Sequence, residues 1–255
     1  MAKLGPAAFL SVVREVRAGA GDRRPIVVAG ARELVPLVTK ALRGGGEPTA
    51  VREGGRPDGG AVLVWIGKAD EAALRAAALA HVPIVGLTEG ESLPYVLDTD
   101  IVAVRPGEGV PVEDIAARIA AALGETGTDL AARLPVLRAA VVDELIRLTA
   151  RKNAIVAAAV IVPGADLPVL TLNQARLVLR IALAHGRDVD GSRLAELLGV
   201  VGAGFGLRAL ARRLLGLVPV AGWAARGAVA YAGTKAIGEA ARTYFETGGS
   251  VRLGS

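Results

Sequence analysis

Short hydrophobic runs alternate with helical patterns in the first half of the chain. Runs typical of buried strands lie at 25–30, 61–67, 83–87 and 100–104, with a short edge strand near Ala50. Helical periodicity fills the intervals at 32–42, 70–81 and 111–123. Strands that alternate with helices of this length predict parallel βαβ units.

The pattern changes at Gly-Glu-Thr-Gly-Thr-Asp, residues 124–129, after which helical periodicity runs from Leu130 to about Phe245. We therefore predict an α/β plus all-α fold, with a small Rossmann-type domain of three layers followed by a helical bundle. The predicted divisions are an N-terminal amphipathic helix and linker at 1–23, an α/β domain at 24–124, a helical domain at 130–247 and a disordered tail at 248–255. The first residues lack the pattern of a signal peptide.

The amino-acid composition excludes several kinds of functional site. The chain has no cysteine and only two histidines, His81 and His185, which excludes disulfides, thiolate nucleophiles and multi-histidine metal sites. Aromatic residues make up only 3% of the chain, too few for platforms that stack nucleic-acid bases. We expect no nucleic-acid partner, and no catalytic residue, cofactor or metal emerges from the sequence.

Nucleotide-binding motifs are also missing. The first strand is followed by Gly-Ala-Arg-Glu-Leu-Val-Pro-Leu-Val-Thr-Lys, which lacks the glycine and the Lys-Ser/Thr order of a phosphate-binding loop. Gly-Lys-Ala-Asp at 67–70 imitates a guanine-reading motif without its asparagine, so Asp70 is predicted to cap the next helix. His185 is predicted to lie near a helix C-terminus.

Charge divides unevenly between the two halves. Residues 1–132 hold 14 Lys/Arg and 17 Asp/Glu, a net charge of −3, whereas residues 133–255 hold 16 and 8, a net charge of +8. An apolar and basic second half favours an anionic phospholipid surface over DNA. The candidate residues for contact with lipid or a partner are Arg176, Arg180, Arg208, Arg212, Arg213 and Trp223. Solvated helix faces and a core tryptophan remain the alternative interpretation.

Asp166 is the single charge between Lys152 and Arg176. Pro163-Gly164 and Pro168 interrupt this apolar segment, which excludes one straight membrane span. Two half-length helices remain, as a re-entrant hairpin in lipid or as a buried hairpin. Asp166 is either the N-cap of the second helix or an intramembrane carboxylate that handles a proton or cation.

Two stretches resemble known families. Val-Ala-Val-Arg-Pro-Gly-Glu-Gly and the helix after it, at 102–123, resemble the last strand and closing helix of Era-type GTPase domains. Residues 24–124 therefore look like a degenerate GTPase-like domain. Residues 133–246 resemble the YcjF-type helical domain of unknown function, through Pro-Gly-Ala-Asp, Leu-Thr-x-x-Gln, Val-Pro-x-x-Gly-Trp and Thr-x-Ala-x-Gly. Members of that family accompany Era-type GTPases and are often membrane-associated.

The resemblance implies a non-enzymatic, membrane-associated regulatory module that works with an Era-type GTPase. It would be cytoplasmic, peripheral to or partly inserted in the inner membrane, and a homo-oligomer is compatible with it. Two alternatives stay open: a membrane-inserted channel or remodelling protein that uses its Pro-Gly hairpins, and an enzyme that binds nucleotide in an unorthodox way.

Overall fold

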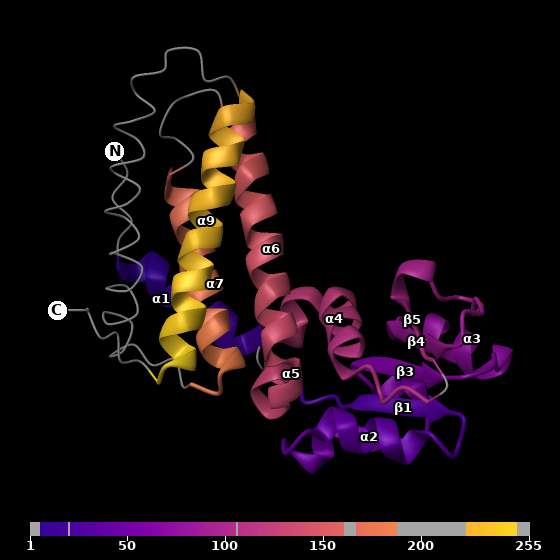
Figure 1. Ribbon diagram of the computed structural model, residues 1–255. Coiled ribbons are helices and arrows are strands. Elements are labelled where there is room, and N and C mark those ends of the chain that lie inside the picture. Colours follow the sequence, from indigo (N-terminus) through magenta and orange to yellow (C-terminus); the bar gives the residue numbers. More distant parts are fainter. Residues whose placement is uncertain (1–5, 20, 106, 161–166, 188–222, 249–255) are drawn as a thin grey trace. The chain divides into compact units, whose positions relative to one another are not determined.

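The computed structural model describes residues 6–19, 21–105, 107–160, 167–187 and 223–248 (Figure 1). The chain forms two compact units. One, the α/β unit, comprises Asp22–Glu144; the other, the helical unit, combines Met1–Gly21 with Leu145–Ser255. The two units are described separately below.

A five-stranded parallel sheet forms the centre of the α/β unit (Figure 1). Its strands stand in the order β2-β1-β3-β4-β5. They are β1 (Ile26–Gly30), β2 (Val51–Glu53), β3 (Val62–Ile66), β4 (Ile84–Thr88) and β5 (Ile101–Ala103). The four predicted strands and the edge strand near Ala50 are confirmed. Chain order reverses between β1 and β3, so the sheet has one of the common doubly wound orders.

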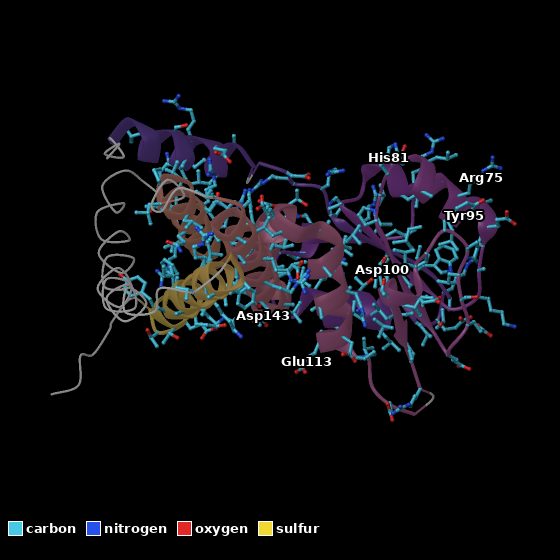
Figure 2. The ribbon with its side chains drawn as sticks, turned by 90° about the horizontal axis from the view of Figure 1, so that it is seen from above. Arg75, His81, Tyr95, Asp100, Glu113 and Asp143 are labelled. Carbon is cyan, nitrogen blue, oxygen red and sulfur yellow. The ribbon has the colours of Figure 1, made fainter. Side chains whose placement is uncertain are left out.

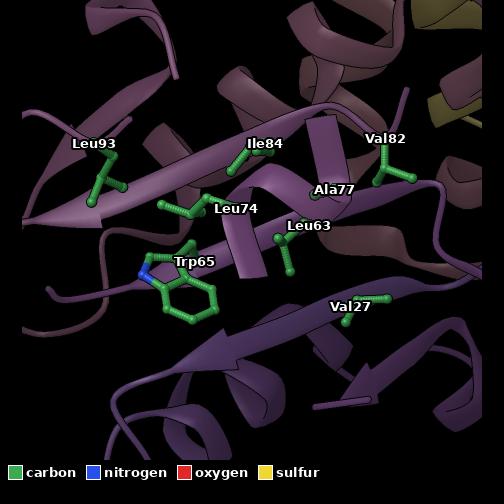
Figure 3. Close-up of a cluster of buried hydrophobic side chains, with 8 residues drawn as sticks. All are labelled: Val27, Leu63, Trp65, Leu74, Ala77, Val82, Ile84 and Leu93. Atoms are coloured by element: carbon green, nitrogen blue, oxygen red, sulfur yellow. The ribbon is translucent and has the colours of Figure 1, made fainter. Parts of the chain in front are cut away.

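Helices cover both faces of this sheet. The α3 helix (Glu71–Leu79) packs on β4, and its Leu74 and Ala77 join a buried cluster with Leu63 and Trp65 of β3 (Figure 3). The α2 (Val35–Arg43) and α4 (Val112–Leu123) helices contact each other as well as the strands, so they share the other face. Strands covered on both faces are hydrophobic throughout, which explains their unbroken apolar runs.

The α/β unit continues beyond the predicted boundary at 124–129. A short 3₁₀ turn (Gly124–Gly127) leads directly into α5 (Thr128–Arg133) and α6 (Pro135–Ala159). Arg133 fixes this segment, because its carbonyl accepts the Glu47 amide at 2.9 Å and its guanidinium donates to the Arg23 carbonyl at 3.1 Å. Its side chain is only 8% exposed and forms an ion pair with Asp129 at 3.2 Å. Burial raises the pKa of Asp129.

The helical unit contains α1 (Pro6–Gly19), the later part of α6, α7 (Leu167–Ala184) and α9 (Trp223–Glu246). The N-terminal helix, predicted with the linker, packs on α7 and buries Val12, Val13 and Val16. The α9 helix approaches α6 closely at Gly238, where an added Cβ would lie 2.5 Å from Ile146 Cγ1. Small residues at such positions allow helix backbones to come close together.

Candidate functional site

A pocket of about 490 Å³ opens at the carboxyl edge of the α/β sheet. It lies beside the point where the strand order reverses, which is where doubly wound sheets bind ligands. Its volume falls within the range of small-molecule sites. We call it the carboxyl-edge pocket. Its apolar lining residues are Leu34, Leu37, Val38, Ile66, Leu87, Val104, Val110 and Pro111.

Charged side chains also line this pocket. They are one lysine, Lys68, and three glutamates, Glu89, Glu91 and Glu108, and all four residues are exposed. Glu108 forms an ion pair with Arg105 at 3.5 Å. The three carboxylates and one ammonium give the lining a net charge of −2, so the pocket has apolar walls and a net acidic lining.

The turn after β1 lies where a phosphate-binding loop would stand in a nucleotide-binding α/β domain. The amides of Leu34 and Val35 both donate to the Ala31 carbonyl, at 3.0 and 3.1 Å. These are the groups that a phosphate loop would turn toward its ligand. Leu34 and Leu37 stand beside them, with 43% and 55% of their surfaces exposed. The helix predicted at 32–42 therefore begins at Val35 and is preceded by a turn that ends at Leu34.

The Gly-Lys-Ala-Asp segment is structural. Asp70 is the N-cap of α3, and its carboxylate accepts the Ala73 amide at 3.1 Å, as predicted. The Lys68 carbonyl accepts the indole N–H of Trp65 at 2.9 Å, which fixes the turn to the core. Gly67 and Lys68 of this segment line the pocket.

A second surface lies at the opposite edge of the same sheet. Leu79 ends α3 shortly before β4, and Leu97 lies shortly before β5, so both precede neighbouring parallel strands. Residues that precede neighbouring parallel strands lie toward the amino edge of a sheet, and Tyr95 lies on the same connection as Leu97. Leu79 is 71% exposed, Leu97 70% and Tyr95 53%, and Tyr95 adopts a left-handed backbone with φ of 64°. We call these three residues the amino-edge apolar surface.

Leu79, Tyr95 and Leu97 are candidate contact residues because each is a large apolar side chain that is exposed. Exposed large apolar side chains that gather in one place mark interaction sites more often than scattered ones do. A left-handed conformation is costly for a tyrosine and is found where the surrounding structure holds it. Figure 2 shows Tyr95 and Arg75 of α3 at one end of the α/β unit, whereas His81, which follows α3, and Asp100, which precedes β5, lie away from that end.

The helical unit buries a network of polar side chains. Asn153 of α6 donates to Thr234 of α9 at 2.9 Å and accepts from Asn173 of α7 at 2.8 Å. Gln174 of α7 donates to the same Thr234 hydroxyl at 3.1 Å. These four residues are at most 5% exposed. Gln174 and Thr234 belong to the Leu-Thr-x-x-Gln and Thr-x-Ala-x-Gly motifs, which therefore join three helices.

Two arginines predicted to face lipid or a partner lie on α7. Arg176 forms an ion pair with Glu15 of α1 at 2.8 Å and also donates to Asn173 at 3.4 Å. Hydrogen bonds from Arg176 lower the pKa of Glu15, and the positive charge of Arg180 acts in the same direction. The structure thus brings Arg176 and Arg180 toward α1.

The remaining predicted residues are only partly covered. Asp166, Arg208, Arg212 and Arg213 lie outside the described residues, and so does the predicted tail at 248–255 except for its first residue. Trp223 is the first residue of α9. The segments on either side of Asp166 do pack together, since Ala157 of α6 and Leu170 of α7 share a buried cluster with Ala230.

The two histidines are placed at helix ends. His185 follows α7, and its Nδ1 lies 2.8 Å from the Ile181 carbonyl, which confirms the prediction of a helix C-terminus. His81 follows α3 in a left-handed conformation, with φ of 54°. Within the described ranges, no three acidic, histidine or cysteine side chains are grouped so that they could hold a metal ion.

One helix of the described part, α7, is long and apolar enough to cross a membrane. About 56% of it is buried inside the protein, as in the core helix of a soluble domain. No family model matches the chain, and no curated protein or solved structure matches it.

Three of these features could not be predicted from the sequence. Leu34 and Leu37 follow helical spacing and therefore resemble core residues, although they line an open pocket. Asn153 and Asn173 lie on apolar helices, where a buried amide signals a polar partner on another helix. The exposure of Tyr95 and Leu97 follows from the path of a loop, which periodicity does not describe.

Proposed function

We propose that the chain is a non-enzymatic interaction module that works with an Era-type GTPase at a membrane surface. The observation that carries the proposal is the amino-edge apolar surface of Leu79, Tyr95 and Leu97. Tyrosine and apolar residues are suited to protein contacts because they bury much area with little loss of conformational freedom. A degenerate GTPase-like identity of the α/β unit remains part of this proposal, and so does a bundle arrangement of the helical unit.

Two features support a binding role over a catalytic one. After β1, the Leu34 and Val35 amides donate to the Ala31 carbonyl, and Leu34 and Leu37 line the pocket with apolar side chains. In the helical unit, the described polar network links neutral amides and a hydroxyl to each other. Such groups orient helices and carry no charge that could transfer a proton at neutral pH.

The partner can be tested by calorimetric titration of the full chain with the Era-type GTPase of the same genome. We expect a Kd in the micromolar range or tighter. Leu97→Asp should weaken the complex at least tenfold, because a charge at the centre of an apolar contact loses its hydration. Ile155→Asp is the matched control, since Ile155 is 69% exposed and lies on α6 of the helical unit.

The outcomes are distinct. Equal weakening by Leu97→Asp and Ile155→Asp would remove the amino-edge apolar surface from the interface. Absence of binding by the unmodified chain, with the GTPase loaded with either GDP or a GTP analogue, would contradict the proposed partnership itself.

Membrane insertion is the second candidate function, and α7 is the observation that favours it. A peripheral protein is released from membranes by alkaline carbonate, whereas an inserted hairpin stays with the lipid. We expect release, because α7 packs against α1 and α9 within the protein. Retention after carbonate would favour the channel or remodelling function instead.

A further inference from the structure

The walls of the carboxyl-edge pocket are held in place by hydrogen bonds of the sheet. The Gly67 amide donates to the Leu87 carbonyl at 2.8 Å, and the Val104 amide donates to the Thr88 carbonyl at 2.7 Å. These bonds join the ends of β3, β4 and β5. The pocket therefore exists before a ligand arrives, as ligand sites on α/β folds usually do.

Thr88 adds order to the turn that carries two of the acids. Its hydroxyl donates to the Glu91 carbonyl at 2.8 Å and accepts the Gly90 amide at 3.3 Å. This turn fixes the backbone that carries Glu89 and Glu91 at the pocket. The Thr88 hydroxyl offers a ligand little hydrogen-bonding capacity, because its proton is already donated to the Glu91 carbonyl.

The lining is unsuited to phosphate and carboxylate ligands. Its net charge is −2, and no ion pair joins Glu89 or Glu91 to another side chain in the part of the chain that the structure describes. These two carboxylates would repel an anionic group, and Lys68 is the one lysine or arginine of the lining that would attract it. A positively charged group would be attracted to them, and an apolar body would fit the leucine and valine walls.

We propose that the carboxyl-edge pocket binds a small amphiphilic amine. Its apolar body lies between Leu37, Leu87 and Val104, and its ammonium group lies near Glu89 and Glu91. The site is separate from the amino-edge apolar surface, so this inference does not depend on the partner GTPase.

Two dyes that share one fluorophore test the charge preference. Dansylcadaverine carries an amine, whereas dansylglycine carries a carboxylate on the same apolar group. Titrated into the full chain, dansylcadaverine should bind with a Kd of about 10 μM, typical of a ligand of this size in an apolar pocket. Its emission should shift to the blue, and dansylglycine should bind at least tenfold more weakly.

Two variants locate the dye. Val110→Trp fills the pocket from its partly exposed wall and should weaken dansylcadaverine binding at least tenfold. Ile155→Trp is its control, because it places an indole at an exposed position on α6 of the helical unit, and it should leave the Kd unchanged. The double variant Glu89→Gln/Glu91→Gln should weaken dansylcadaverine about fivefold and leave dansylglycine unchanged or tighter.

Three results would overturn the proposal. They are no saturable binding of dansylcadaverine, an equal or stronger affinity for dansylglycine, and unchanged binding by either the Val110→Trp or the Glu89→Gln/Glu91→Gln protein. The two glutamates are exposed, so the double variant tests the site even if tryptophan at position 110 disturbs folding.

Discussion

The polar side chains that cap α3 and line the pocket of the α/β unit contrast with the buried network of the helical unit. In the α/β unit, the side chains of Asp70 and Glu89 lie at the ends of strands and helices, where they cap turns or surround a pocket. In the helical unit, Asn153 and Gln174 lie in the interior and bond to another helix. A parallel sheet satisfies its own backbone and sets its register through strand pairing. Packed helices lack that constraint, and buried hydrogen bonds between them can fix their alignment.

Removal of the central amide should have the largest effect. Asn153→Ala leaves the Thr234 hydroxyl and the Asn173 amide buried without this partner, and we expect a loss of about 3 kcal/mol in the free energy of unfolding. Urea denaturation measures it. The exposed neighbour Ile155→Ala serves as control, and a loss below about 1 kcal/mol at Asn153 would mean that the network contributes little.

A larger side chain at the close approach of α9 to α6 should cause the second-largest loss of stability. Gly238→Val would force its side chain into Ile146, and we expect a loss of about 2 kcal/mol. Ala236→Val on the exposed side of α9 controls for the lower helix propensity of valine. Thermal unfolding of the two variants compares them directly. Equal melting temperatures would show that the helices can separate at no cost.

The N-cap of α3 should contribute less to the free energy of unfolding than the two features above. Asp70→Ala removes the acceptor of the Ala73 amide and should cost about 1 kcal/mol, whereas Asp70→Asn should cost only a few tenths, because asparagine caps nearly as well. Chemical denaturation of both variants distinguishes them. A similar large loss for both would assign Asp70 to an interaction that depends on its charge.

The ion pair between Glu15 and Arg176 should have the smallest effect. The pKa of Glu15 is lowered in the folded state, so its contribution is present above the ordinary glutamate pKa and is lost as the pH falls through the folded value. The Glu15 side chain is 50% exposed, which limits the contribution to about 0.5 kcal/mol. Glu15→Gln should remove the contribution of this ion pair to the pH dependence of stability. A profile of unfolding free energy against pH that matches the unmodified chain would contradict this prediction.

The elements of the α/β unit were predictable because parallel strands are hydrophobic on both faces and helices have a regular period. The cap at Asp70 was predictable for the same reason, since it depends on neighbours three residues away. Asn153 and Thr234 are 81 residues apart, so their contact depends on the packing of α6 and α9. Likewise, Glu15 of α1 pairs with Arg176, which lies 161 residues away along the chain. Local periodicity contains no information about such pairs.

Equilibrium dialysis of the full chain against labelled GTP with Mg²⁺ tests most directly whether the α/β unit is a binding module without nucleotide chemistry. The Leu34 and Val35 amides donate to the Ala31 carbonyl, and Glu89 and Glu91 line the pocket, so we predict no saturable binding up to millimolar GTP. Binding with a micromolar Kd, followed by release of phosphate, would contradict the account and favour an enzyme.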